Sequence, residues 1–255
     1  MQRKSLKLII FSSIALLTSI AITNSNRSLA ASQTQMSRNY RKLPVKLNQR
    51  QDGSNRGRPT KRKGMGSRSD CPAANIPLTA LIPEDKISKV VEANPKFWFY
   101  IPYQPNTIPV GEFVLQDEAN NDVYRDSFPI DKGEGIVSIN LSGKNLEADK
   151  IYQWYFKLYC DRDKLSTQIY VRGWVQRVAL QPQKQKQLSS ASSPRQRAAF
   201  YAQNDIWYSA LTELAKLKQA NPQNQMIAKY WLQLLNDVGL QEFSDRPIVG
   251  NINLD

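Results

Sequence analysis

The chain has 255 residues, a formal net charge of +13 at pH 7, two cysteines and no histidine. Without histidine there is no Ser-His-Asp triad, no Cys-His nucleophile pair and no histidine site for zinc, copper or non-haem iron. Only catalysis by carboxylates or lysines is left open, and we expect no enzyme activity, no cofactor and no metal site.

Residues 1–30 have the pattern of a secretory signal peptide. Basic residues precede an apolar run over residues 8–22, and Ser28 and Ala30 are small residues at the two positions that a signal peptidase recognises. The alternative is a membrane anchor, but the run has 15 residues, whereas spanning a bilayer takes about 20. We therefore expect export, cleavage near Ala30, and a periplasmic or extracellular mature protein with no membrane span.

The excess positive charge lies before residue 71. Residues 1–30 hold four basic residues and no acid, residues 31–70 hold eleven basic and two acidic residues, and residues 71–255 hold twenty of each. Residues 31–70 contain few apolar side chains, so we expect a disordered basic linker. It is either a solvated spacer or an attachment to anionic envelope polymer or lipid. We expect no nucleic-acid partner for an exported chain.

Residues 71–180 contain about seven short strand-like runs, separated by Pro, Gly and Asn. This spacing of strands and turns predicts an antiparallel β-sandwich of the immunoglobulin-like kind. In the run over residues 150–160, Trp154 and Phe156 fall on a core face, while Tyr155 and Lys157 fall on the other face.

Two acidic clusters, residues 117–126 and 161–163, lie between these runs. Neither supplies the alternating carboxylates and the glycine of a calcium loop. Asp and Asn are common turn residues, so both clusters are interpreted as hairpin turns.

Cys71 and Cys160 are the two cysteines of a chain that we expect to reach an oxidising compartment. They are predicted to form one disulfide bond. A shared metal ion is the alternative, but the chain offers no histidine to complete such a site. A bridge over a loop of this length adds at most about 4 to 5 kcal/mol in the chain-entropy model.

Large aromatic side chains occur on the outward face of several strands. In the run Phe97 to Tyr100, Trp98 and Tyr100 share one face of an extended strand and the two phenylalanines share the other. A soluble monomer seldom leaves such a surface bare. The predicted binding surface consists of Trp98, Tyr100, Tyr155, Tyr170, Arg172 and Trp174.

A polar linker over residues 181–192 precedes helical periodicity over residues 193–240, and residues 241–255 form a tail. Ser193 followed by Pro194 is a helix-start signal. Four residues have the spacing of a tetratricopeptide unit, namely Tyr201, Ala210, Leu214 and Pro222. We expect a short helical, tetratricopeptide-like segment that packs on the sandwich and covers one aromatic face. An uncovered ligand surface is the alternative.

Eight segments, in order, look like the conserved blocks of a known family. They are "CPAANIPLTALIPEDK", "PKFWFYIPY", "EFVLQDEANNDVY", "GIVSINL", "LEADKIYQWYFKLYCD", "VRGWVQRV", "AFYAQNDIWYSALTELAKL" and "WLQLLNDVGL". On these blocks the chain resembles the cyanobacterial family called domain of unknown function 928. The resemblance implies a cyanobacterial exported protein, and it brings no known activity, ligand or catalytic residue. Where the family has glycine at the helical turn, this chain has Asn204-Asp205, which can form a similar turn.

Two functions from different classes remain open. The first is a non-enzymatic exported cell-envelope protein that acts as a protein-interaction module and binds an envelope protein. The second is a glycan-binding module, in which Trp and Tyr rings stack on sugars beside Arg172. Helical cover of the aromatic rings favours the first function, and a row of open rings beside polar groups favours the second.

Overall fold

The computed structural model describes residues 59–64, 71–84, 86–141, 143–161, 163–164 and 166–254. The expected signal peptide, with its cleavage site, and most of the expected linker lie outside these residues. All described residues belong to one unit, residues 44–255.

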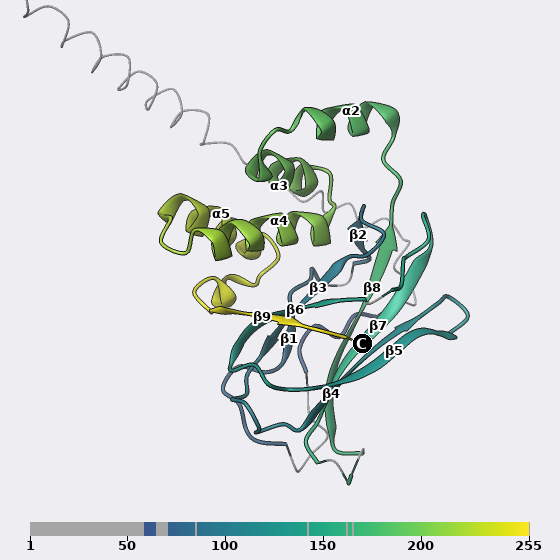
Figure 1. The fold of residues 1–255 in the computed structure, drawn as a ribbon, viewed down its shortest axis with the longest axis vertical. Helices are drawn as coiled ribbons and strands as arrows, with labels where there is room; N and C mark the ends of the chain where they lie inside the picture. The colour runs from purple at the N-terminus through teal and green to yellow at the C-terminus, as the bar shows by residue number, and fades with distance from the viewer. Residues whose placement is uncertain are drawn as a thin grey trace, which may run out of the picture. The chain divides into compact units, whose positions relative to one another are not determined.

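The described strands form two sheets (Figure 1). They are β1 (Thr79–Ala80), β2 (Ser88–Val90), β3 (Lys96–Ile101), β4 (Val110–Gln116), β5 (Asp122–Pro129), β6 (Gly135–Asn140), β7 (Ile151–Tyr159), β8 (Gln168–Arg177) and β9 (Ile248–Ile252). The four-stranded sheet has the order β1-β3-β6-β9, and the five-stranded sheet has the order β2-β8-β7-β4-β5. Two pairs are parallel, β2 with β8 and β6 with β9, and the other neighbours are antiparallel.

The two sheets pack against each other through large aromatic side chains. Phe99 of β3 stacks on Phe156 of β7 with 4.2 Å between ring centroids, and Phe97 lies 4.9 Å from Phe113 of β4. Trp154 is completely buried between the sheets. Apolar area removed from water contributes roughly 25 cal/mol per Å², so these rings are a main source of the stability of the fold.

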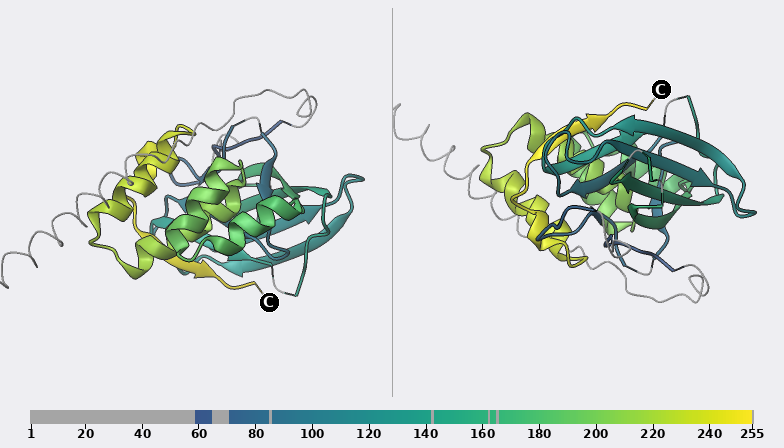
Figure 2. Two further views of the ribbon diagram at one scale, coloured as in Figure 1. Left: turned by 90° about the horizontal axis from the view of Figure 1, so that it is seen from above. Right: turned by 90° about the horizontal axis from the view of Figure 1, so that it is seen from below.

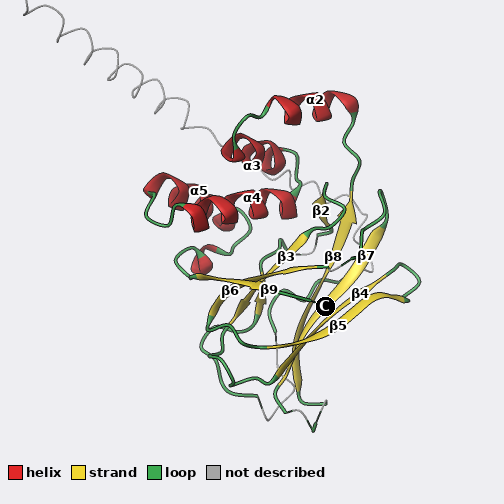
Figure 3. Ribbon diagram, in the orientation of Figure 1, coloured by secondary structure: helices red, strands yellow, loops and turns green. Residues whose placement is uncertain are grey.

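The helices follow β8 and gather at one end of the sheets (Figures 2 and 3). They are α2 (Pro182–Ser190), α3 (Pro194–Gln203), α4 (Trp207–Ala220), α5 (Gln225–Asn236) and a 3-10 turn, η2 (Gln241–Phe243). A mostly β protein with helices near its C-terminus is therefore confirmed. Ser193 begins α3 with a capping box, in which its side chain and that of Gln196 accept each other's backbone N–H. Asp205 has a φ of 61° between α3 and α4, the left-handed conformation that glycine would adopt.

The C-terminal helices cover the second face of the aromatic strand β3. Trp98 Nε1 donates a hydrogen bond to Thr212 Oγ1 of α4 at 3.0 Å, and the Tyr100 ring lies 5.0 Å from the Phe243 ring of η2. Trp98 and Tyr100 are 2% and 1% exposed. They therefore do not belong to an accessible binding surface, contrary to the sequence-based expectation, because a helix and the 3-10 turn lie over them.

Residues 59–64 differ from the expected linker, since they are built into the fold. Lys61 pairs with β8 and Lys63 pairs with β1 as isolated bridges. The guanidinium of Arg62 donates to the Val238 carbonyl at 2.7 Å and lies 2.9 Å from Glu84 Oε1. This arginine satisfies a carbonyl just beyond the end of α5, a place where helices leave acceptors without partners.

Two further boundaries differ from the expectation. The expected linker 181–192 contains α2, which begins with proline at its first position and buries none of its residues. The expected tail 241–255 contains β9, which pairs with β6. Pairing between strands so distant in the sequence cannot be recognised from a five-residue pattern alone.

The predicted disulfide bond between Cys71 and Cys160 is confirmed. Their Cα atoms are 5.1 Å apart, and 89 positions separate them in the sequence. The bond ties the segment before β1 to the end of β7, a central strand of the five-stranded sheet.

Candidate functional site

The outer face of the five-stranded sheet collects polar and aromatic side chains from several strands. Along β8, buried side chains alternate with half-buried ones, so one side of the strand faces away from the core. The register places Arg172 opposite Tyr155 and places Tyr170 opposite Lys157. It also places Glu112 of β4 opposite Lys157. Three adjacent strands therefore contribute to one continuous surface.

Four of the six residues predicted to form a binding surface lie together on this face. They are Tyr155, Tyr170, Arg172 and Trp174, all half-buried. The other two, Trp98 and Tyr100, belong to the four-stranded sheet and are buried beneath the helices.

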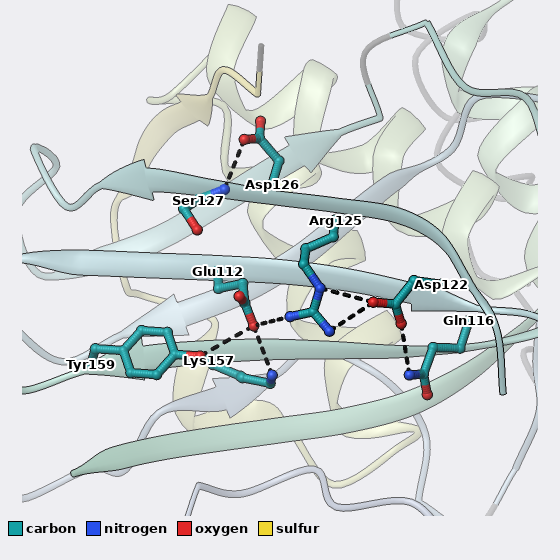
Figure 4. Close-up of polar contacts among 8 residues, drawn as sticks. All are labelled: Glu112, Gln116, Asp122, Arg125, Asp126, Ser127, Lys157 and Tyr159. Carbon is teal, nitrogen blue, oxygen red and sulfur yellow. Dashed lines mark hydrogen bonds and ion pairs between the residues drawn. The ribbon is translucent and has the colours of Figure 1, made fainter. Parts of the chain in front are cut away.

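Glu112 is the centre of a polar cluster on this face (Figure 4). Its Oε1 atom accepts hydrogen bonds from Lys157 Nζ at 2.7 Å and from the Tyr159 hydroxyl at 3.2 Å, and Arg125 Nη1 lies 2.8 Å away. The Glu112 side chain is 12% exposed. Burial, together with the neighbouring Glu112, raises the pKa of Tyr159 to about 12. The phenol is therefore neutral at physiological pH and acts as a donor.

Arg125 connects Glu112 to a second carboxylate. Its Nε and Nη2 atoms both lie 2.8 Å from Asp122 Oδ2, and Gln116 Nε2 donates to Asp122 Oδ1 at 2.8 Å. In Figure 4 the Arg125 side chain lies between the two carboxylates. The Arg125 guanidinium thus reaches from β5 to β4 and links the side chains of Asp122 and Glu112.

The charges in the cluster lower the pKa values of both carboxyl groups. Burial by itself would raise the pKa of Glu112, but hydrogen bonds from Lys157 and Arg125 outweigh burial and hold that pKa below its ordinary value. Hydrogen bonds from Gln116 and then Arg125 lower the pKa of Asp122. Both carboxylates are charged at neutral pH, and Lys157 and Arg125 balance them.

An aromatic strip, formed by Tyr155, Tyr170 and Trp174, lies beside the polar cluster. The Tyr155 and Tyr170 ring centroids are 6.3 Å apart. Lys61 Nζ lies 3.8 Å from the Tyr170 centroid, and Lys157 Nζ lies 6.0 Å from the Tyr155 centroid. Both distances are within the range of a cation–π interaction. The strip therefore presents rings that already have ammonium groups over them.

The acidic hairpin between β4 and β5 is a turn held by its own side chains. Asp117 Oδ1 accepts hydrogen bonds from the backbone N–H groups of Ala119 and Asn121, both at 2.9 Å. Asn120 has a φ of 65°, a conformation that Asn tolerates better than most residues. Among the described residues, no three His, Cys, Asp or Glu side chains gather closely enough to hold a metal ion.

Sequence patterns did not predict the polar cluster or the position of Lys61, although they placed Lys157 on the outward face of its strand. Alternation along β4 could have placed Glu112 on the outward face, but its partners on β5 and β7 depend on the pairing register. Lys61 lies in a segment whose composition indicated a spacer, so nothing local pointed to its place beside Tyr170.

Taken together, fold and surface define a mostly β protein of two packed sheets with C-terminal helices and a mixed aromatic and charged sheet face. Residues 63–248 match the family described as Domain of Unknown Function (DUF928), and the chain belongs to that family. A comparison with curated proteins finds no match.

Proposed function

We propose that this protein is a non-enzymatic, exported cell-envelope protein that binds a partner protein through the outer face of its five-stranded sheet. The observation that carries the proposal is the aromatic strip with Arg172 beside it. Tyr, Trp and Arg are the residue types that dominate the binding energy of protein interfaces. Here they stand on β7 and β8, two neighbouring central strands of the sheet, and side chains on a rigid sheet lose little entropy on binding.

A glycan-binding module is the second candidate function, because three aromatic rings lie next to polar groups on one face. A sugar stacks on an open ring face, however, and Lys61 Nζ lies over Tyr170 at 3.8 Å from the ring centroid. Lys157 is also near the Tyr155 ring. This arrangement favours a protein partner, whose side chains can approach the ring edges and the ammonium groups together.

We propose no catalytic role because the carboxyl groups of the polar cluster have unsuitable pKa values. A general acid or base acts best when its pKa lies near the working pH. The pKa values of Glu112 and Asp122 are instead lowered by their partners. The cluster is therefore suited to fix the shape and charge of a surface rather than to transfer protons at neutral pH.

Export is supported by the Cys71–Cys160 disulfide bond, because such bonds persist in oxidising compartments. Within the described part of the chain, no helix has the length and the apolar character needed to cross a membrane. The proposed signal peptide lies outside the described residues.

We also propose an immunoglobulin-like arrangement of the sheets and a tetratricopeptide-like arrangement of the helices. The order β8-β7-β4-β5 corresponds to strands G-F-C-C′ of a variable-type immunoglobulin domain, and β1-β3-β6 corresponds to A-B-E. For the helices, Tyr201, Ala210 and Leu214 are all buried, as expected of repeat consensus positions.

The proposal is tested by affinity capture from a periplasmic extract. The wild-type protein is compared with a Tyr155→Ser, Trp174→Ser double variant and with a Lys184→Gln, Lys186→Gln control on α2, whose residues are all unburied. A partner protein should be captured by the wild type and by the control, and lost with the double variant. Equal capture by all three proteins would show that the outer face of the five-stranded sheet does not bind the partner. Saturable quenching of Trp fluorescence by a soluble envelope glycan, lost in Trp174→Ser, would instead favour the glycan function.

A further inference from the structure

Four cations on the outer sheet face fall into two groups. Lys157 and Arg125 lie within 2.8 Å of carboxylate oxygens. Lys61 and Arg172 have no carboxylate partner among the described residues. Lys61 contacts the Tyr170 ring, and the Arg172 side chain makes neither a hydrogen bond nor an ion pair within the described part of the chain, where its Nε atom is buried without an acceptor.

Lys61 and Arg172 are direct neighbours across an isolated antiparallel bridge. The backbone N–H of each donates to the carbonyl oxygen of the other at 3.0 Å. Residues paired in this way have Cα atoms about 5.5 Å apart and side chains on the same face. Two like charges placed directly opposite each other destabilise a sheet. An anion between them would remove this repulsion, so the pair is suited to receive one.

The surroundings of the pair strengthen its attraction for an anion. Arg172 stands between Tyr170 and Trp174 on the outward side of β8 and lies opposite Tyr155 on β7. The Nε atom of this guanidinium is buried, and a lower local dielectric strengthens charge–charge interactions. Lys89 of β2, opposite Gln176 of β8, adds a further positive charge along the same face.

We infer that Lys61 and Arg172 form a receptor for the carboxylate of an acidic segment in the partner protein. This inference rests on the proposed function and names the chemistry that the partner must present. Arginine binds a carboxylate through two parallel N–H···O bonds, and Lys61 supplies a second charge from the neighbouring chain segment. A sugar acid would have to stack on the Tyr170 ring that Lys61 already covers, so a glutamate or aspartate of a peptide fits better.

Trp174 provides a local signal for the test. The four other tryptophans, Trp98, Trp154, Trp207 and Trp231, are at most 2% exposed, whereas Trp174 is half-buried beside Arg172. Poly-L-glutamate is titrated into the full-length protein, with polygalacturonate as the carboxylated polysaccharide for comparison. Poly-L-glutamate should change the Trp fluorescence in a saturable way, and Trp174→Phe should abolish that signal.

The receptor is identified by matched charge variants. Arg172→Gln and Lys61→Gln should each raise the dissociation constant, measured from the Trp174 fluorescence, about tenfold. This is the size expected for the loss of one charge-assisted hydrogen bond. Arg172→Lys should retain part of the affinity. Lys184→Gln with Lys186→Gln, which removes two charges from α2, should behave as the wild type. Melting curves verify folding, and Lys61→Gln decides the outcome if Arg172→Gln fails to fold.

Three results would overturn the inference. The first is an affinity for poly-L-glutamate that neither Lys61→Gln nor Arg172→Gln changes. The second is binding of polygalacturonate at Trp174 without binding of poly-L-glutamate. If partner capture is lost in the Tyr155→Ser, Trp174→Ser variant but persists in Lys61→Gln with Arg172→Gln, the carboxylate receptor is wrong and the proposed function stands.

Discussion

The indole nitrogen of Trp154, at the centre of the packed sheets, donates a hydrogen bond to the hydroxyl of Tyr208 on α4 at 2.8 Å. Both side chains are at most 1% exposed. Burial also raises the pKa of Tyr208 far above its ordinary value, so the hydroxyl stays protonated. The helices are thus joined to the core of the sheets by a buried polar contact as well as by apolar packing.

Replacing Tyr208 by phenylalanine should therefore destabilise the whole fold. The change leaves the buried Trp154 N–H without an acceptor, which costs about 1 to 3 kcal/mol. Urea unfolding measures the loss. Tyr155→Phe, on the half-buried outer face, is the control and should change stability by less than about 0.5 kcal/mol. Equal losses of stability in the two variants would show that the hydrogen bond between Trp154 and Tyr208 does not stabilise the packing of α4 on the sheets.

Gly173 is expected to tolerate no larger side chain. A Cβ atom at this position would lie 2.4 Å from Trp154 Cζ2 and 2.8 Å from Ile82 Cδ1. Because the core is closely packed, Gly173→Ala should cost about 1 to 3 kcal/mol. Gly133→Ala is the matched control, since the nearest atom to its Cβ would be 3.5 Å away, and its melting temperature should stay close to that of the wild type. A stable Gly173→Ala protein would contradict this packing.

Arg62 should stabilise the fold although it precedes the sheets. Arg62→Gln removes the hydrogen bond to the Val238 carbonyl and the contact with Glu84, so we expect a loss of about 1 to 3 kcal/mol in urea unfolding. Lys63→Gln changes the charge equally, but Lys63 is 48% exposed and pairs with Glu242 at the surface. That variant should lose less than about 1 kcal/mol. Similar losses in both would mean that Arg62 acts only through its charge.

The Cys71–Cys160 bond should contribute substantially to stability. Replacing both cysteines by serine should lower the free energy of unfolding by about 2 to 5 kcal/mol, mainly because the unfolded chain gains freedom. Reductant should have the same effect on the wild type and none on the variant. Non-reduced peptide mapping checks the bond itself, and two free thiols in protein purified from an oxidising compartment would contradict it.

The Glu112 cluster should make stability depend on pH in the acid range. The pKa of Glu112 is lowered in the folded state, so its ionised form adds stability above its ordinary value of 4.5, and this contribution is lost as the pH falls through the lowered pKa. Urea unfolding between pH 3 and 7 should therefore show a smaller decline in Glu112→Gln than in the wild type. Parallel curves for the two proteins would show that Glu112 is not stabilised by Lys157 and Arg125.

The local pattern of the sequence was enough to assign several positions. Alternation along β7 placed Trp154 and Phe156 in the core and Tyr155 on the opposite face, because side chains of any strand alternate with a period of two. Ser193 with Pro194 predicted the start of α3, because capping involves only neighbouring residues. The disulfide bond was predicted from two cysteines in a chain that we expect to be exported.

Only the tertiary structure decided which outward side chains stay on the surface and which are covered by another part of the chain. Trp98 and Trp174 look alike in the sequence, yet α4 covers Trp98 and leaves Trp174 on the outer sheet face. Lys61 lies beside Arg172 only because its segment pairs with β8, more than a hundred residues later in the chain. Such contacts depend on register and on the docking of distant elements, and no periodicity within one segment encodes them.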